Sequence, residues 1–229
     1  MIDDPSREGE GGSPALEPLD AVEARILGCL VEKAATTPEV YPLTENAVVT
    51  ACNQKTSREP VMNLEPGKVA HALRVMEDKG LVRVAPSSQR ARRYEHRFDT
   101  VYGTTARQRA TLCVMLLRGP QTLAELLTRC ERIAAFPSLD DVRDTVERLI
   151  AREPALVVNL GRASGQREDR YMHLLAGEVD ASAWATAAAS TSAAPGSRSD
   201  LAERVERLEA EVAAVREELA TLRESFGGA

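Results

Sequence analysis

The chain has few aromatic residues and no long apolar run. Phe, Trp and Tyr make up 3% of its 229 residues, although 43% of the residues are hydrophobic. Its cores must therefore consist of Leu, Val, Ile and Ala, as in small helical units. No stretch approaches the roughly 20 apolar residues of a membrane span, and residues 1–18 lack the apolar run of a signal peptide. We expect a cytoplasmic protein with no membrane-spanning segment.

Residue types that usually build catalytic and metal sites are sparse. The four cysteines form no Cys-x-x-Cys pair, and the three histidines are too scattered to complete a metal set. We expect free thiols packed as small apolar groups; a reactive thiol at Cys52, close to Lys55, is the alternative. The sequence contains no glycine-rich phosphate loop and no Ser/His/Asp set. We therefore predict no enzyme activity, no cofactor and no metal.

The net charge of −6 is unevenly distributed. Residues 1–18 contribute −4 and residues 181–229 contribute −3, which leaves +1 for residues 19–103 and 0 for residues 104–180. The acidic total therefore does not exclude a nucleic-acid partner. It does argue against a strongly electrostatic, nonspecific nucleic-acid binder.

One short sequence occurs twice, 77 positions apart, as Arg93-Tyr94-Glu95-His96 and Arg170-Tyr171-Met172-His173. Each copy ends the same predicted order of elements: three helices, then two strands around a turn. This is the order of a winged helix, a variant of the helix-turn-helix. We predict an α+β, mainly helical fold with two tandem winged-helix domains, residues 19–103 and 104–180, after a disordered leader at residues 1–18.

Periodicity and caps predict where the elements of the two domains lie. The first domain is expected to have helices at about 20–35, 44–51 and 66–79 and strands at 81–85 and 92–98. The second is expected to have helices at about 105–117, 123–130 and 138–150 and strands at 156–160 and 170–175. Asp20 and Thr44 are the expected helix caps. At Ser138 the sequence resembles a capping box with Asp141 in place of the usual Glu.

The strongest periodicity of the chain occupies residues 200–226, after an Ala/Ser-rich linker at residues 181–199. Apolar residues there alternate in steps of 4 and 3, with opposite charges at the flanking positions, as in a parallel two-stranded coiled coil. The predicted dimerisation seam is Leu201, Val205, Leu208, Val212, Val215, Leu219 and Leu222. We predict a weak homodimer through this short segment. The alternative is an amphipathic helix that packs on the protein's own domains.

Residues 27–63 contain a string that is too particular to reflect composition alone. Its main parts are Leu27-Gly28-Cys29-Leu30-Val31-Glu32-Lys33, Thr36-Thr37-Pro38-Glu39-Val40-Tyr41-Pro42-Leu43-Thr44 and Ala51-Cys52-Asn53-Gln54-Lys55-Thr56-Ser57-Arg58-Glu59-Pro60-Val61-Met62-Asn63. This string resembles the YceH family, a largely uncharacterised group of bacterial proteins. The resemblance covers about residues 20–176 and implies a tandem winged-helix fold but no established activity. Ser57 stands where the family leads us to expect Asn, and we expect the leader and the linker to be additions in this chain.

Basic and polar residues of the first domain form the candidate DNA-binding site. In a helix-turn-helix unit the third helix enters the major groove, and the wing contacts the backbone or the minor groove. Arginine forks suit phosphates and guanine edges. The expected contacts are Lys68, His71, Arg74, Arg90, Arg92, Arg93, Asn53, Gln54, Lys55 and Arg58. The alternative is an ordinary solvated face with a basic turn and a self-capping polar loop.

The second domain differs from the first in the charge of its third helix. That helix carries Asp140, Asp141, Asp144 and Glu147, which would repel phosphate. We expect it to pack on the first domain, on a second copy or on another protein.

His96 and His173 occupy equivalent strand positions, and we expect a repeated structural role with the ring in a polar contact rather than a metal site. Tyr94 and Tyr171 are expected to be half-buried strand aromatics.

Two functional hypotheses remain. The first is a dimeric, DNA-binding transcriptional regulator, and the alternative is a protein-interaction scaffold that uses the winged helices and the coil without DNA.

Overall fold

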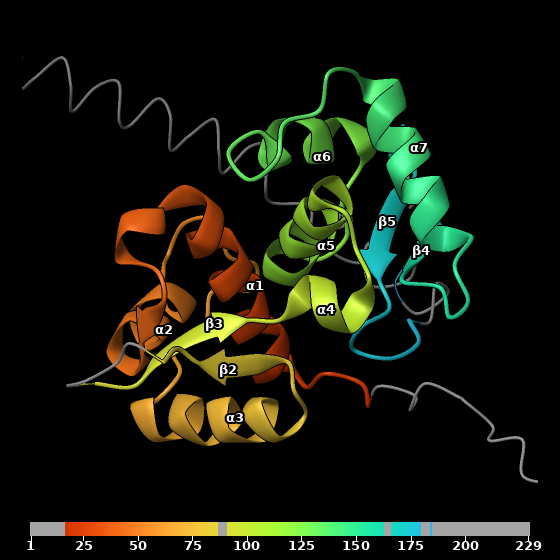
Figure 1. The fold of residues 1–229 in the computed structure, drawn as a ribbon. Coiled ribbons are helices and arrows are strands. Elements are labelled where there is room, and N and C mark those ends of the chain that lie inside the picture. The colour runs from red at the N-terminus through yellow and green to blue at the C-terminus, as the bar shows by residue number, and fades with distance from the viewer. Residues whose placement is uncertain (1–16, 87–90, 163–165, 180–183, 185–229) are drawn as a thin grey trace, which may run out of the picture. The chain divides into compact units, whose positions relative to one another are not determined.

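The computed structural model describes residues 17–86, 91–162, 166–179 and 184 (Figure 1). The first repeat contains α1 (Ala21–Thr36), η1 (Pro38–Val40), β1 (Leu43–Thr44), α2 (Glu45–Cys52), α3 (Pro66–Asp78), β2 (Val82–Val84) and β3 (Arg93–His96). After a short α4 (Phe98–Tyr102), the second contains α5 (Ala106–Arg118), α6 (Leu123–Cys130), α7 (Leu139–Ile150), β4 (Val157–Gly161) and β5 (Arg170–His173). The predicted coiled coil, most of the leader and the linker apart from Trp184 lie outside the described residues.

A side chain caps free backbone N–H groups at the start of α1, α2, α5, α6 and α7. The Asp20 carboxylate accepts hydrogen bonds from the Val22 and Glu23 N–H groups, and Glu23 accepts one from the Asp20 N–H, which completes a capping box. At α7 the expected box is only half formed. Ser138 Oγ accepts from the Asp141 N–H, but Asp141 binds the Ser138 hydroxyl instead of the backbone N–H. Asp is one methylene shorter than the Glu that normally closes such a box.

The first sheet has three antiparallel strands in the order β1-β3-β2. The predicted hairpin of β2 and β3 is present, and β1 is a third strand that was not predicted. On the central strand, Tyr94 lies opposite Leu43 of β1 and Val84 of β2. The second sheet pairs β4 with β5, and an isolated bridge joins Gln121 to Tyr171. Gln121 therefore occupies the place of β1, and both repeats have the strand order and helix order of a winged helix. The predicted α+β fold class is confirmed.

The repeated arginine ties the hairpin to the segment before the second helix. In the first repeat Arg93 Nη1 donates to the carbonyl oxygen of Pro42 at 2.9 Å. In the second, Arg170 Nη1 donates to the carbonyl oxygen of Pro120 at 3.0 Å. The same contact formed twice is a structural reason for the duplicated sequence. The neighbouring tyrosines are not equivalent, because Tyr94 is buried whereas Tyr171 is half-buried as expected.

The two repeats pack through their first helices, α1 and α5, which lie side by side (Figure 1). Residues 22–31 of α1 are all buried, because α1 has the rest of its own repeat on one side and α5 on the other. Gly28 allows the close approach: a Cβ there would lie 2.8 Å from Leu117 Cδ2. The Cys113 thiol also contacts the Gly28 carbonyl oxygen at 3.3 Å. Among the described residues, no helix is both long and apolar enough to cross a membrane.

Candidate nucleic-acid interface

Helix α3 separates an apolar face from a basic face. Val69, Leu73 and Met76 are fully buried, as the periodicity predicts. Lys68, His71 and Arg74 lie at spacing of three on the exposed side. None of these three side chains makes a hydrogen bond or an ion pair with another residue in the described part of the chain. The three are therefore accessible to a ligand.

The arginines at the base of the β2–β3 turn are exposed, but each already has an internal partner. Arg92 forms an ion pair of 3.0 Å with Glu77 on α3, and its guanidinium lies 5.8 Å from the centre of the Tyr94 ring. Arg93 makes the bond to the Pro42 carbonyl oxygen described above. Arg90, at the predicted tip of the wing, lies outside the described residues. A DNA phosphate would have to compete with these contacts or add to them.

The polar loop ahead of α3 is mostly self-bonded. The Asn53 amide accepts from the Leu64 N–H at 2.7 Å and donates to the Leu64 carbonyl oxygen at 2.9 Å. Gln54 accepts a hydrogen bond from Arg58 at 2.9 Å. Lys55 is exposed, and no described residue binds its ammonium group. Gln54 uses only its amide oxygen in this contact, so among the described residues both the Gln54 Nε2–H groups and the Lys55 ammonium group are left to donate to a phosphate.

Arg58 is the clearest departure from the predicted site. Its side chain is 0% exposed and forms a two-pronged ion pair with Glu32 of α1, at 2.6 and 3.1 Å. Its Nε donates to the Ala51 carbonyl oxygen at 3.0 Å. Burial acts to lower the pKa of Arg58, but the Glu32 carboxylate and Cys29 together act more strongly in the other direction, so the pKa is raised. Arg58 therefore holds the loop to α1 from inside and is excluded from a DNA-contacting surface.

A second buried arginine, Arg25, was not identified from the sequence. Its guanidinium donates to the carbonyl oxygens of Cys52 at 3.1 Å and Pro60 at 2.6 Å, and burial lowers its pKa. The available signal was its position between apolar residues of α1. A charge inside such a run must find buried acceptors if its helix is covered on all sides. Arg25 and Arg58 together fix both ends of the polar loop.

The cysteines and histidines form no reactive site among the described residues. All four cysteines are free and buried. The pKa of Cys52 is raised, through its hydrogen bond with Cys29 and through burial, which argues against a reactive thiolate. His96 has the expected polar contact, because its Nδ1 accepts from the Phe98 N–H at 3.3 Å. His173 does not, because its buried Nδ1 has no hydrogen-bond partner. The described residues contain no cluster that could hold a metal ion.

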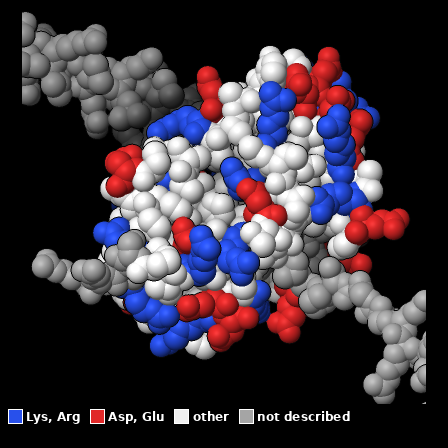
Figure 2. All heavy atoms as spheres, viewed as in Figure 1, with Lys and Arg blue, Asp and Glu red and all other residues white. Residues whose placement is uncertain are grey.

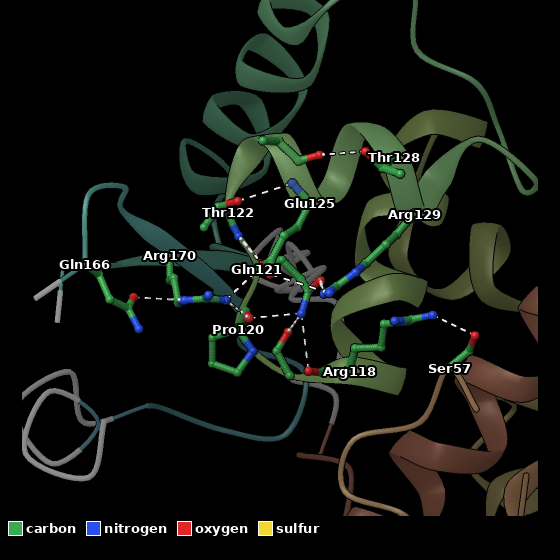
Figure 3. Close-up of polar contacts among 12 residues, drawn as sticks. Ser57, Arg118, Pro120, Gln121, Thr122, Glu125, Thr128, Arg129, Gln166 and Arg170 are labelled. Carbon is green, nitrogen blue, oxygen red and sulfur yellow. Dashed lines mark hydrogen bonds and ion pairs between the residues drawn. The ribbon is translucent and has the colours of Figure 1, made fainter. Parts of the chain in front are cut away.

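In the second repeat, a polar network locks residues 118–122 (Figure 3). The buried Gln121 amide donates to the carbonyl oxygens of residues 118–120 and accepts from Arg129. Arg170 binds Glu125 at 2.9 Å, and Arg118 crosses to the first repeat, where it binds Ser57 Oγ at 2.6 Å. These arginines are therefore engaged in joining segments of the protein. The sequence analysis did not identify this network.

The third helix of the second repeat exposes a mixed surface rather than a basic one. α7 packs on α5, α6 and β4. Asp140 pairs with Arg143 of the same helix, and Asp141 lies 3.6 Å from Arg107 of α5. Asp144 and Glu147 are exposed. This arrangement is unfavourable for a helix that would lie against phosphates.

The chain is similar to bacterial proteins of unknown function along most of its length. Residues 19–166 match the family model "Protein of unknown function, DUF480". A "UPF0502 protein" of Stenotrophomonas maltophilia (strain K279a) is 56% identical over 213 residues, which cover 92% of this chain and 97% of that protein. One from Xanthomonas oryzae pv. oryzae (strain MAFF 311018) is 55% identical over 214 residues, which cover 92% of this chain and 95% of that protein.

The match extends through both repeats at more than half identity. The chain therefore belongs to the DUF480 family of proteins of unknown function, whose relatives named above are called UPF0502 proteins.

Proposed function

We propose that the protein binds duplex DNA through α3 and the β2–β3 turn of the first repeat and acts as a transcriptional regulator. The observation that carries this proposal is the exposed basic face of α3. Lys68, His71 and Arg74 lie on the third helix of a winged-helix arrangement, and their side chains are not used within the described part of the protein. A third helix in this position is the element that enters the major groove in helix-turn-helix proteins.

The charges around α3 predict modest rather than strong electrostatic binding. Glu77 and Asp78 follow the basic residues at the end of the same helix, and Glu77 pairs with Arg92. Figure 2 shows Lys and Arg side chains interspersed with Asp and Glu side chains over the face that it draws. We therefore expect few phosphate contacts and a shallow dependence of affinity on salt.

The test is the binding of labelled duplex DNA by fluorescence anisotropy over a series of salt concentrations. The Lys68→Ala/Arg74→Ala variant should bind more weakly. Because each phosphate contact contributes about 0.9 to the slope of log affinity against log salt, that slope should fall by about 2. Arg143→Ala/Arg148→Ala on α7 removes the same charge from exposed helix positions and should leave the slope unchanged.

Two outcomes would refute the site. One is an absence of binding by the unmodified protein at low salt. The other is an equal loss in the α3 and α7 variants, which would indicate an effect of net charge alone.

The second candidate function is a protein-interaction scaffold. It is favoured by the internal partners of Arg92 and Arg93 and by the exposed acidic residues of α7. A defined protein partner, recovered without nucleic acid and lost in an Asp144→Lys/Glu147→Lys variant, would support this function. Recovery of the same partner by that variant would exclude α7 as its site.

Dimerisation through residues 200–226 and a cytoplasmic location also belong to this proposal. The seam residues lie outside the described part of the chain, so the proposal rests on their periodicity. Deletion of residues 200–229 should lower the mass measured by light scattering, and an unchanged mass would refute the role of the segment. We also propose that the protein is a member of the YceH family and that it has no enzymatic activity.

A further inference from the structure

A pocket of about 330 Å³ lies where the first sheet passes into α4. This volume is near the lower end of the range of about 300–1,000 Å³ for small-molecule sites. The pocket is lined by Tyr41, Arg83, Glu95, His96, Arg97 and Thr100. It therefore combines residues from the segment before β1, from both strands of the hairpin and from the helix that connects the two repeats.

The lining is rich in hydrogen-bond donors. The Tyr41 hydroxyl accepts from the His96 N–H at 2.7 Å, which leaves its own proton to donate, and burial raises its pKa. Because His96 Nδ1 accepts from the Phe98 N–H, a neutral His96 carries its proton on Nε2. Burial, reinforced by Arg109, lowers the pKa of His96 to about 4, so the ring is a neutral donor near pH 7.

The charged groups leave an excess of positive charge. Arg83 pairs with Glu95 across the strands, which neutralises both side chains. The exposed Arg97 guanidinium has no ion pair with any residue that the structure describes. Nearby, Arg109 is paired with Asp99. Two arginines and one glutamate line the pocket, so an anionic ligand is favoured over a cation.

The second repeat shows that the hairpin does not require these residues. The cross-strand pair Arg83–Glu95 corresponds to Val158–Met172, which has the same register. Arg97 corresponds to Leu174, one position after the repeated histidine, and Tyr41 corresponds to Gly119. Of these positions, only the histidine is shared. The polar lining therefore belongs to the first repeat alone, although both repeats build the same two strands.

We propose that this pocket binds a small ligand through an oxyanion, either a carboxylate or a phosphate. Arg97 supplies the unpaired charge, and the Tyr41 hydroxyl, His96 Nε2–H and Arg83 supply neighbouring donors. Hydrogen bonds to an ionised oxygen are about twice as strong as bonds between neutral groups. The site stands independently of DNA binding, because no residue of the basic α3 face lines it.

The experiment titrates inorganic phosphate, sulfate and acetate separately into the full chain at neutral pH. The readout is the ¹⁵N shift of the His96 ring and the backbone shifts of residues 95–100. At least one of the three anions should give saturable shifts confined to the pocket. A response to acetate alone would identify a carboxylate, and a response to phosphate or sulfate would identify a tetrahedral oxyanion.

The decisive variant is Arg97→Gln, which removes an exposed charge and should leave the fold intact. It should lower the affinity for the anion by about tenfold, the usual effect of losing one charge-assisted hydrogen bond. Arg74→Gln on α3 is the matched control and should not change the affinity. The proposal fails if none of the three anions saturates, or if Arg74→Gln weakens binding as much as Arg97→Gln, because the anion would then lie on the general basic surface.

Discussion

The two repeats build the same framework and use it for different purposes. In both, a side chain caps the second helix, and an arginine of the hairpin binds a proline carbonyl oxygen. In both, the second strand of the hairpin also pairs with the segment before the second helix. They differ in the third helix. Lys68, His71 and Arg74 are exposed on α3, whereas Asp144 and Glu147 are exposed on α7. The contacts that shape the hairpin and cap the second helix are thus duplicated, whereas the charges on the exposed side of the third helix are not.

The repeats also differ in how they use buried charge. The first repeat contains Arg25 and Arg58, two largely enclosed guanidiniums that hold the loop between α2 and α3. In the second repeat, the arginines of the network in Figure 3 are half-buried rather than fully enclosed. We infer that the loop of the first repeat is held in a particular shape by interior charges. Four substitutions test the contacts that distinguish the two repeats or join them.

The largest effect is expected from Glu32→Ala. It leaves the Arg58 guanidinium buried without its carboxylate, and the loss of one partner of a buried pair typically costs about 3–5 kcal/mol. Glu32 is 16% exposed at its side chain, so water reduces this cost toward the lower value. The free energy of unfolding in urea is the measurement. Asp140→Ala, which breaks the exposed pair with Arg143 on α7, should cost less than about 1 kcal/mol. Equal costs would mean that Arg58 is hydrated.

The second prediction concerns the buried His173, whose side chain has no partner at Nδ1. Burial lowers its pKa to about 4 in the folded protein, against about 6.5 in an unfolded chain. Between these values the unfolded chain binds a proton that the folded protein excludes. Stability is therefore fully present above pH about 6.5 and decreases as the pH falls toward about 4, by about 3 kcal/mol from this group.

The control for this prediction is His173→Leu, which removes the titrating group. Urea unfolding at about pH 7 and about pH 4.5 should show a smaller loss of stability in this variant than in the unmodified protein. The residual loss should include a contribution from His96, whose pKa is also lowered to about 4. An identical pH dependence in both proteins would show that His173 is hydrated or already paired in the folded state.

Much of the fold could be predicted because it depends on local patterns. The caps at Asp20 and Thr44 and the apolar stripe of α3 determine helices within a few residues of their observed bounds. The two-residue strand β1 and the short α4 were missed, because strands and helices of this length have no periodicity to detect.

The candidate site was predicted less well than the fold. Exposed residues on a helix with a clear apolar face, such as Lys68 and Arg74, could be assigned from spacing alone. The location of Arg58 depends on a contact with Glu32, 26 positions away, and no local pattern encodes such a contact. Loop residues are therefore the least predictable part of a binding site.

Gly28→Val tests the interface between the two repeats. The new side chain would meet Leu117 and the Leu116 Cβ, the latter 3.2 Å from the new Cβ, in a contact where both helices are buried. Overpacking of this kind costs about 1–3 kcal/mol. Gly67→Val on α3 is the control, because nothing lies within 4 Å of its Cβ position. Thermal unfolding should give a lower Tm for Gly28→Val than for Gly67→Val. The same Tm for both would mean that the repeats separate at little cost.

The smallest expected effect is a gain in stability from Ser57→Asn. Ser57 has φ of 60°, a left-handed conformation that Asn adopts more readily than Ser. Its hydroxyl also accepts the hydrogen bond from Arg118, and the Asn side-chain oxygen can provide an acceptor there. We expect a gain of about 0.5 kcal/mol, or roughly 1–2 °C in Tm for a chain of this size. Ser57→Ala keeps the unfavourable backbone and removes the acceptor, so it should lower the Tm. If Ala and Asn have the same effect, neither the backbone conformation nor the bond to Arg118 contributes to joining the repeats.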